Sequence, residues 1–223
     1  MFGMKTYECE WMDRVLEDGS KIPTTKEVLE WLNDHFFGLY EYRDQYVSKY
    51  CFPLITVEAL DELAMDICNV LSETGKSKVL EVCCGSGYLG SLLKIKGIDI
   101  VCTDNHNWRD DERRNKKFFR TAYTDIEELD AVEAVEKYHD DIGCVILSWP
   151  EYESDLAEKV LRKCLEYGIS MIYIGEDLGG CTADDGFFNL IEEECDEIMI
   201  VHSYVQFDGM HDYVSLITKK TSS

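Results

Sequence analysis

Glycines and carboxylates with a spacing suited to a nucleoside lie between residues 81 and 104. The apolar run 79–82 predicts a strand, Gly85 and Gly87 predict a tight turn, and a helical pattern begins at Tyr88. Glycine lets the backbone approach a ligand without a Cβ in the way, and a helix N-terminus offers free N–H groups. Asp104, nineteen residues after Gly85, ends the next predicted strand, where a carboxylate can accept both hydroxyls of a ribose. The segment therefore predicts a nucleoside-binding turn.

Two enzyme classes use such a turn. Gly85-x-Gly87-x-x-Gly90 followed by Asp104 satisfies the dinucleotide fingerprint. Glu81, however, lies inside the strand, where that fingerprint is usually apolar. Glu-x-x-x-Gly-x-Gly resembles the first motif of class I S-adenosylmethionine-dependent methyltransferases. A turn that uses glycine only for packing is the third alternative, and it leaves a carboxylate inside an apolar strand unexplained.

The methyltransferase resemblance implies a role for each residue of this segment. Glu81 would hold the amino end of the methionine part, the glycine turn would pass beneath the cofactor, and Asp104 would bind ribose. After the third strand an acid would contact the adenine amino group; Asp130 fits better than Asp125, with simple helix capping as the alternative. The predicted cofactor-binding residues are Glu81, Cys83, Gly85, Ser86, Gly87, Asp104, Asn105, Asp130 and Ser148.

A second motif follows the apolar run 144–147, where Pro150 marks the carboxyl end of a strand. Trp149-Pro150-Glu151-Tyr152 resembles the Asp/Asn/Ser-Pro-Pro-Tyr motif of methyltransferases that act on amino nitrogens. The chain departs from it at Trp149, which has a donor but no acceptor, and at Glu151 in place of the second proline. Ser148 or Glu151 would have to supply the acceptor. The alternative is a hydrophobic lip over the sheet.

Two acids follow the next strand. Glu176 would act as a base or bind a cation; otherwise Glu176 and Asp177 are solvated turn residues. Together with the Trp-Pro-x-Tyr motif, Gly175-Glu176-x-x-Gly179-Gly180-Cys181-Thr182 looks like a poorly characterised branch of the methyltransferase superfamily, over roughly residues 50 to 195. The predicted catalytic residues are Trp149, Pro150, Glu151, Tyr152 and Glu176. Cys181 reads as structural, and the five histidines lack metal-ligand spacing, so no metal is expected.

Short apolar runs alternate with helical patterns after Gly75, which predicts an α/β, Rossmann-like, doubly wound sheet of seven mostly parallel strands. The last strand should be antiparallel because its connection is too short for a parallel crossover. Strands are expected at 79–82, 98–103, near 122–123, and at 144–147, 169–175, 197–207 and 213–219; helices are expected at 88–96, 154–167 and 186–194.

The first 75 residues read as helical. Thr24 and Glu27 form a capping-box pattern, and Thr56 can cap a second helix that Gly75 ends. We expect residues 1–75 to form an N-terminal helical cap of the same domain as the methyltransferase-like part, 76–223.

The chain has 223 residues, with 22 Lys and Arg against 45 Asp and Glu, a net charge of -23. This charge argues against nonspecific nucleic-acid binding and against anionic membranes. The segment 109–120 is locally basic: it is either a solvated stretch of alternating charges or a site for an anionic group. No apolar run approaches the length of a membrane span, and no signal peptide is visible. We therefore expect a cytoplasmic, reducing compartment, in which the ten cysteines stay reduced.

These observations favour an S-adenosylmethionine-dependent methyltransferase whose acceptor, a small molecule or a protein nitrogen or oxygen, is unidentified. One alternative is a binding protein that keeps the fold without catalysis. The other is an NAD-dependent oxidoreductase, which Glu81 and the lack of room for a substrate domain disfavour. A homodimer stays open.

Overall fold

The computed structural model of the chain describes residues 9–35, 39–107 and 121–220. The basic segment 109–120 lies outside the described residues. Within the described part, seven strands form one sheet in the order β3-β2-β1-β4-β5-β7-β6. The strands are β1 (Lys78–Val82), β2 (Asp99–Asp104), β3 (Glu127–Glu128), β4 (Ile142–Ser148), β5 (Ser170–Gly175), β6 (Cys195–Ile200) and β7 (Tyr213–Lys219).

Strand β7 alone among these runs against the others. It pairs antiparallel with β5 on one side and with β6 on the other, whereas β1, β2, β3, β4 and β5 pair in parallel. The predicted fold class is therefore confirmed, including the antiparallel last strand.

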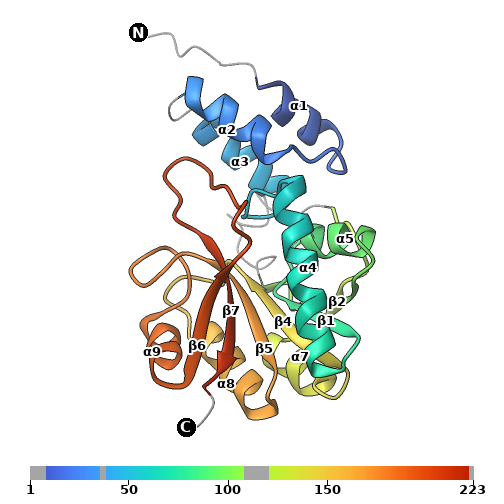
Figure 1. Ribbon diagram of the computed structural model, residues 1–223, viewed down its shortest axis with the longest axis vertical. Helices are drawn as coiled ribbons and strands as arrows, with labels where there is room; N and C mark the ends of the chain where they lie inside the picture. The colour runs from blue at the N-terminus through green and yellow to red at the C-terminus, as the bar shows by residue number, and fades with distance from the viewer. Residues whose placement is uncertain (1–8, 36–38, 108–120, 221–223) are drawn as a thin grey trace.

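Helices cover both faces of the sheet (Figure 1). Alternate strand residues point to opposite faces, so Val79 packs with α4 and α5, and Leu80 packs with α7, α8 and α9. The helices are α1 (Glu10–Glu17), α2 (Thr25–Asp34), α3 (Leu39–Lys49), α4 (Val57–Thr74), α5 (Tyr88–Ile95), α7 (Ala131–Tyr138), α8 (Leu156–Tyr167) and α9 (Asp185–Glu194).

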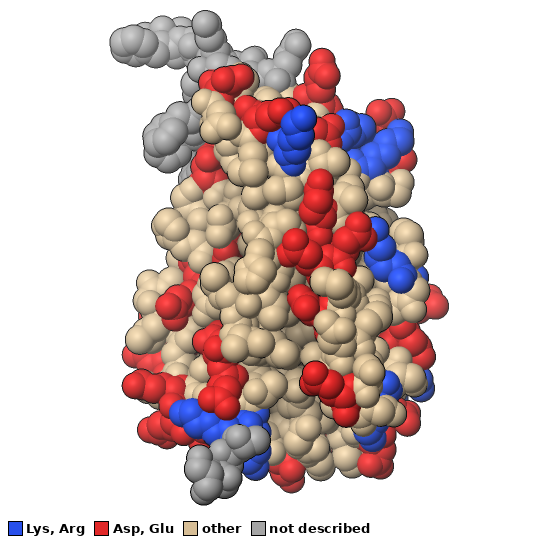
Figure 2. All heavy atoms as spheres, in the orientation of Figure 1, with Lys and Arg blue, Asp and Glu red and all other residues tan. Residues whose placement is uncertain are grey.

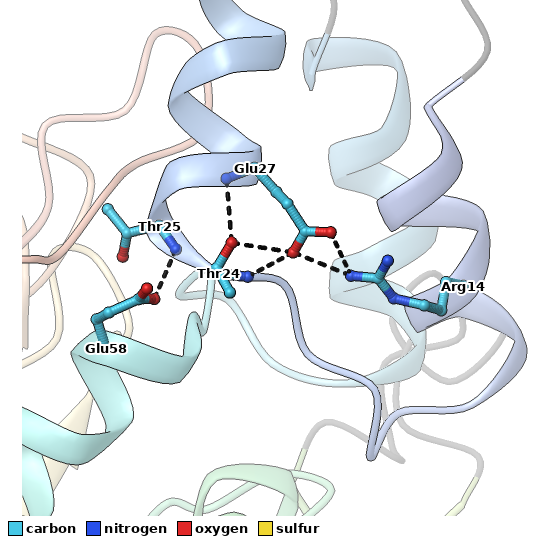
Figure 3. A network of polar contacts seen from close by, with 5 residues as sticks. All are labelled: Arg14, Thr24, Thr25, Glu27 and Glu58. Carbon is cyan, nitrogen blue, oxygen red and sulfur yellow. Dashed lines mark hydrogen bonds and ion pairs between the residues drawn. The ribbon is translucent and has the colours of Figure 1, made fainter.

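The N-terminal helices α1, α2 and α3 lie together at one end of the sheet, while α4 runs along its face (Figure 1). The predicted capping box is present: Thr24 Oγ1 accepts from the Glu27 N–H, and Glu27 Oε2 accepts from the Thr24 N–H at 2.8 Å. Figure 3 shows that Arg14 of α1 also reaches Glu27, and that Glu58 of α4 accepts from the Thr25 N–H. The Glu27 carboxylate thus links α2 to α1, and the Glu58 carboxylate links α2 to α4.

Replacing Glu27 by alanine should lower the free energy of unfolding by about 1 kcal/mol, because the cap and the Arg14 contact are lost together. Urea denaturation measures this. Glu30→Ala, in the same helix with an exposed ion pair to Lys26, should change stability by less than about 0.5 kcal/mol. Equal effects of the two variants would contradict the role of the capping box.

Two sequence expectations are wrong. Residues 122–123 form no strand; β3 lies at 127–128, because the Tyr123 N–H instead donates to the Ser86 carbonyl of the glycine turn. Strand β6 ends at Ile200 rather than at 207, since Val201 takes a positive φ of 57° and turns the chain away. Helix α9 is capped by Asp184, and the nearby Thr182 hydroxyl accepts from the Glu176 N–H.

Acidic side chains spread over the face drawn in Figure 2, from the N-terminal helices to the far end of the sheet. Across 9–35, 39–107 and 121–220, no helix has the length and apolar character needed to cross a bilayer. All ten cysteines lie in these ranges, and none of them is in a disulfide.

Candidate functional site

Backbone strain gathers where the parallel strands end. Cys83 follows β1, His106 follows β2 and Trp149 follows β4, and all three take positive φ angles of 53°, 56° and 49°. Such angles are uncommon outside glycine and persist only where surrounding structure enforces them, often at ligand sites. The carboxyl edge of the sheet is therefore the candidate location of a functional site.

The turn after β1 is built from residues in the left-handed region. Gly85 has φ 57° and Gly87 has φ 69°, and Gly87 is the N-cap of α5. A Cβ at Gly87 would lie 2.8 Å from Cγ2 of Thr124, so glycine is required there for space as well as for angle. The turn thereby directs backbone N–H groups of α5 toward the carboxyl edge.

Asp104 is buried beside this turn. One carboxylate oxygen accepts from the Gly85 N–H at 2.8 Å and the other from the His106 N–H at 2.7 Å. The structure thus brings the predicted ribose-binding acid against the predicted glycine turn, nineteen residues away in sequence. Asn105 lies next to it, and its side chain accepts from the Asn107 N–H.

A cavity of about 60 Å³ lies where the strand order reverses, between the carboxyl ends of β1 and β4. Ligands of open α/β sheets bind at such a switch point. Its lining joins predicted residues of both strand ends with residues of the N-terminal region and of α5: Glu81, Cys83, Gly85, Ser148 and Trp149, with Cys51, Phe52, Cys84 and Leu89.

Glu81 borders this cavity from within the core. Its side chain is 2% exposed, and its Oε2 accepts from the Cys102 thiol at 3.4 Å. Burial raises the pKa of the Glu81 carboxyl well above its ordinary value of 4.5, and the nearby Cys102 and Asp104 act in the same direction. A carboxyl group in this state gains most from a partner that carries positive charge.

The stability of the protein should depend on pH through Glu81. Because its folded-state pKa is raised, its contribution to stability is fully present below 4.5 and is lost as pH rises through the folded-state pKa. Glu81→Gln carries no such loss, so the variant should gain stability relative to the native chain as pH increases. Urea unfolding of both proteins at several pH values tests this, and a difference that stays constant with pH would contradict it.

Four acidic side chains act electrostatically on Cys83, which lines the cavity. Burial raises the pKa of the Cys83 thiol to about 12, and the carboxylates of Asp104, Asp130, Glu151 and Glu81 add to the effect. The structure therefore brings these four predicted residues into one electrostatic neighbourhood. A site of this charge favours a cationic ligand over an anionic one.

Two predicted cofactor residues have structural partners of their own. Asp130 caps α7, its Oδ1 accepting from the Val132 N–H at 2.9 Å. Ser86 is buried, and its hydroxyl donates to the Tyr50 carbonyl. The capping alternative for Asp130 is thus realised, and its contact with adenine stays a prediction, as does the contact of Ser86 with the cofactor.

The Trp-Pro-x-Tyr segment divides in space. Trp149 and Ser148 line the cavity, whereas Pro150, Glu151 and Tyr152 are not among its lining residues. Glu151 is exposed and Tyr152 is 54% exposed. The Trp149 indole stacks on Phe52 with ring centroids 5.3 Å apart, and its N–H donates to Asp212 Oδ2 at 3.2 Å.

Glu176 is buried and holds two loops together. One carboxylate oxygen accepts from the Cys181 N–H at 2.7 Å and the other from the His211 N–H at 2.9 Å. The contact with His211 fixes the backbone on one side of Asp212. On the other side, Tyr213 of β7 pairs with Gly175 of β5. A role of Glu176 as a base stays a prediction.

Sequence reasoning missed four residues around Trp149. Asp212 and Tyr204 come from the connection between β6 and β7, and Tyr204 donates its hydroxyl to the same Asp212 oxygen. Phe52 precedes α4, and the guanidinium of Arg43 in α3 lies 5.6 Å from the Trp149 ring centroid. One signal was available for Asp212: it is an acid directly before β7. Because β7 is antiparallel, its first residues lie at the edge where the parallel strands end.

Among the described residues, no cluster of three or more His, Cys, Asp or Glu side chains is arranged to hold a metal ion.

No family model matches the chain, and neither does any curated protein. Solved structures with a similar fold include WbdD, a bifunctional kinase-methyltransferase, at 16% identity and a TM-score of 0.48, covering 73% of this chain and 40% of that one. The chain thus spans less than half of WbdD. Magnesium protoporphyrin IX methyltransferase (ChlM) from Synechocystis, with bound SAM, has 9% identity and a TM-score of 0.40, covering 74% and 81%. A SAM-dependent methyltransferase from Archaeoglobus fulgidus has 14% identity and a TM-score of 0.43, covering 72% and 94%. At this distance the three structures are similar in fold, and they assign no activity to this chain.

Proposed function

We propose that the chain is an S-adenosylmethionine-dependent methyltransferase. The observation that carries this is the cavity at the switch point between β1 and β4, which Glu81 and the glycine turn line and beside which Asp104 is buried. S-adenosylmethionine combines a ribose with a sulfonium and an ammonium, so it suits a ribose-binding acid in a site of negative charge.

The residues present fit that cofactor. Asp104, against the Gly85 N–H, would accept the ribose hydroxyls, and Glu81 would hold the ammonium of the methionine part. Asn105 and Asp130, beyond β2 and β3, lie on the side proposed for adenine. Ser148 would complete the lining from β4.

The cofactor would supply an electrophilic methyl group, and the task of the chain is to align the acceptor with it. Trp149 lines the cavity and Glu151 acts electrostatically on Cys83, which supports assigning the alignment of the acceptor to these two of the predicted catalytic residues. Pro150, Tyr152 and Glu176 would shape the loops around them.

Binding requires a movement of the N-terminal cap. The cavity of about 60 Å³ is far below the roughly 300–1,000 Å³ of small-molecule sites. Two residues of this cap line the cavity: Cys51, and Phe52, which stacks on Trp149. Displacement of this segment would open the site, as loops commonly do around substrates.

An NAD-dependent oxidoreductase is disfavoured by charge. A pyrophosphate at the glycine turn would approach the carboxylates of Asp130 and Glu151, both of which act on Cys83. The negative charges of the pyrophosphate and of these carboxylates would repel each other.

A binding protein without catalysis is the second candidate. The Phe52–Trp149 stack favours it, because it fills the position where the amine motif would present a polar acceptor. Such a protein would bind the cofactor and transfer no methyl group.

Calorimetry with S-adenosylhomocysteine and with NAD separates these functions. We expect S-adenosylhomocysteine to bind with micromolar affinity and NAD not to bind. Binding of NAD alone would reject the methyltransferase. Transfer of a labelled methyl group to components of a cell lysate, or its absence, then decides between the enzyme and the inactive binding protein.

A further inference from the structure

Asp212 carries a buried oxygen without a partner. Its side chain is 2% exposed, and its Oδ2 accepts from both the Trp149 indole N–H and the Tyr204 hydroxyl. Among the described residues, nothing donates to its Oδ1. A buried acceptor left in this state costs free energy, which a ligand with a donor recovers.

Asp212 is not among the lining residues of the cavity at the switch point, but it contacts one of them, Trp149. The Trp149 ring that it holds lines that cavity. Burial raises the pKa of the Cys51 thiol, which lines the same cavity, and Glu81 and Asp212 add to this effect. Glu81 of β1 and Asp212, in the connection before β7, therefore both act on a residue of the cavity.

The surroundings of Trp149 already bind a cation. The guanidinium of Arg43 lies 5.6 Å from the ring centroid, in a cation–π arrangement. The Nε of Arg43 is buried and has no hydrogen-bond partner among the described residues, so the hydrogen-bond donors of this guanidinium are only partly paired. A second cation with N–H donors could replace it and reach Asp212.

We propose that Asp212 Oδ1 and the Trp149 ring bind a cationic nitrogen that carries N–H groups, an ammonium of the molecule that enters the cavity. Naming that molecule as a methyl acceptor rests on the proposed function. The ammonium of the cofactor's methionine part has the same chemistry, so the experiment includes both sources. Burial raises the pKa of the Asp212 carboxyl, with Glu176 acting in the same direction, and a bound cation would offset this.

The test uses the full chain, Asp212→Asn and the charge-matched control Asp196→Asn, whose side chain is exposed on β6. Asparagine keeps the shape of the side chain and an acceptor for Trp149 and Tyr204. Circular dichroism checks that each variant is folded. The n-butylammonium ion is the acceptor probe, added with S-adenosylhomocysteine and followed by the indole N–H signal of Trp149 in NMR, assigned with Trp149→Phe.

If the acceptor supplies the cation, Asp212→Asn weakens n-butylammonium binding at least tenfold, while tetramethylammonium, which has no N–H and is attracted by the charge alone, loses clearly less affinity. If the cofactor supplies it, calorimetry shows a tenfold loss of S-adenosylhomocysteine affinity in Asp212→Asn and none for 5′-methylthioadenosine, which lacks the amino acid part. Arg43→Gln should strengthen binding of the cation in either case, an effect that a merely structural Asp212 would not produce.

The proposal is overturned if Asp212→Asn binds S-adenosylhomocysteine and n-butylammonium as the native chain does, or if the native chain binds neither. Failure of the proposed function looks different: the native chain would bind n-butylammonium through Asp212 without binding S-adenosylhomocysteine.

Discussion

Asp104→Ala should bind S-adenosylhomocysteine about 100-fold more weakly than the native chain. Two charge-assisted hydrogen bonds to ribose hydroxyls would be lost, and a loss of about 2.7 kcal/mol corresponds to that factor. The variant also removes the acceptor of the Gly85 and His106 N–H groups, which loosens the turn that the ligand would contact. Isothermal titration calorimetry measures the affinity.

Asp99→Ala is the matched control, because Asp99 is an exposed acid at the opposite end of the same strand. It removes an equal charge far from the cavity and should leave the affinity within a factor of two. Asp104→Asn keeps an acceptor for the Gly85 N–H and should fall between the two. Undiminished affinity in Asp104→Ala would remove the ribose assignment.

Gly90→Ala should lower the free energy of unfolding by about 2 kcal/mol, although alanine is the better helix former. The added Cβ would lie 2.5 Å from Oε2 of Glu81 and closer still to the Cys102 sulfur, both in the core. Helix α5 can approach β1 and β2 only because this position has no side chain. Urea denaturation gives the change.

A double-mutant cycle makes this result specific. Cys102→Ala removes the sulfur, so Gly90→Ala should cost clearly less in that background. Ser91→Ala, one position along α5, should cost under about 1 kcal/mol because only its bond to the Tyr88 carbonyl is lost. An alanine at 90 that leaves stability unchanged in the native background would contradict the packing of α5 against Glu81.

The sheet, and the proximity of Glu81, the glycine turn and Asp104, could be predicted because their sequence signals are local. The apolar runs of β1, β4 and β5, the glycine turn and the caps at Thr24 and Thr56 depend on neighbours within a few residues. The ends of parallel strands must meet at one edge, which placed Glu81 and Asp104 together without a structure.

The residues around Trp149 that could not be predicted are brought there by contacts between segments far apart in the sequence. Nothing near Trp149 in sequence indicates that its indole would donate to Asp212, 63 residues later. The same holds for Phe52, which stacks on Trp149 from the segment before α4. A donor at position 149 looked like a defect of the amine motif, whereas in the fold it holds a carboxylate beside the cavity.

The errors in element boundaries have a similar cause. The apolar alternation after Ile200 predicted a longer β6, but Val205 and Phe207 pack into the core with the N-terminal helices instead. Tyr123 suggested a strand because it is aromatic, yet its ring lies 5.4 Å from that of Tyr50 and 5.2 Å from that of Tyr88. Tertiary packing decided both segments.

The most direct test of the account is a crystal structure of the chain soaked or grown with S-adenosylhomocysteine. We expect the ribose hydroxyls within hydrogen-bond distance of the Asp104 carboxylate, the ligand over the turn at Gly85 and Gly87, and Phe52 displaced from Trp149. Crystals at saturating ligand in which that crevice stays closed, or in which the ligand binds elsewhere, would contradict the proposed function.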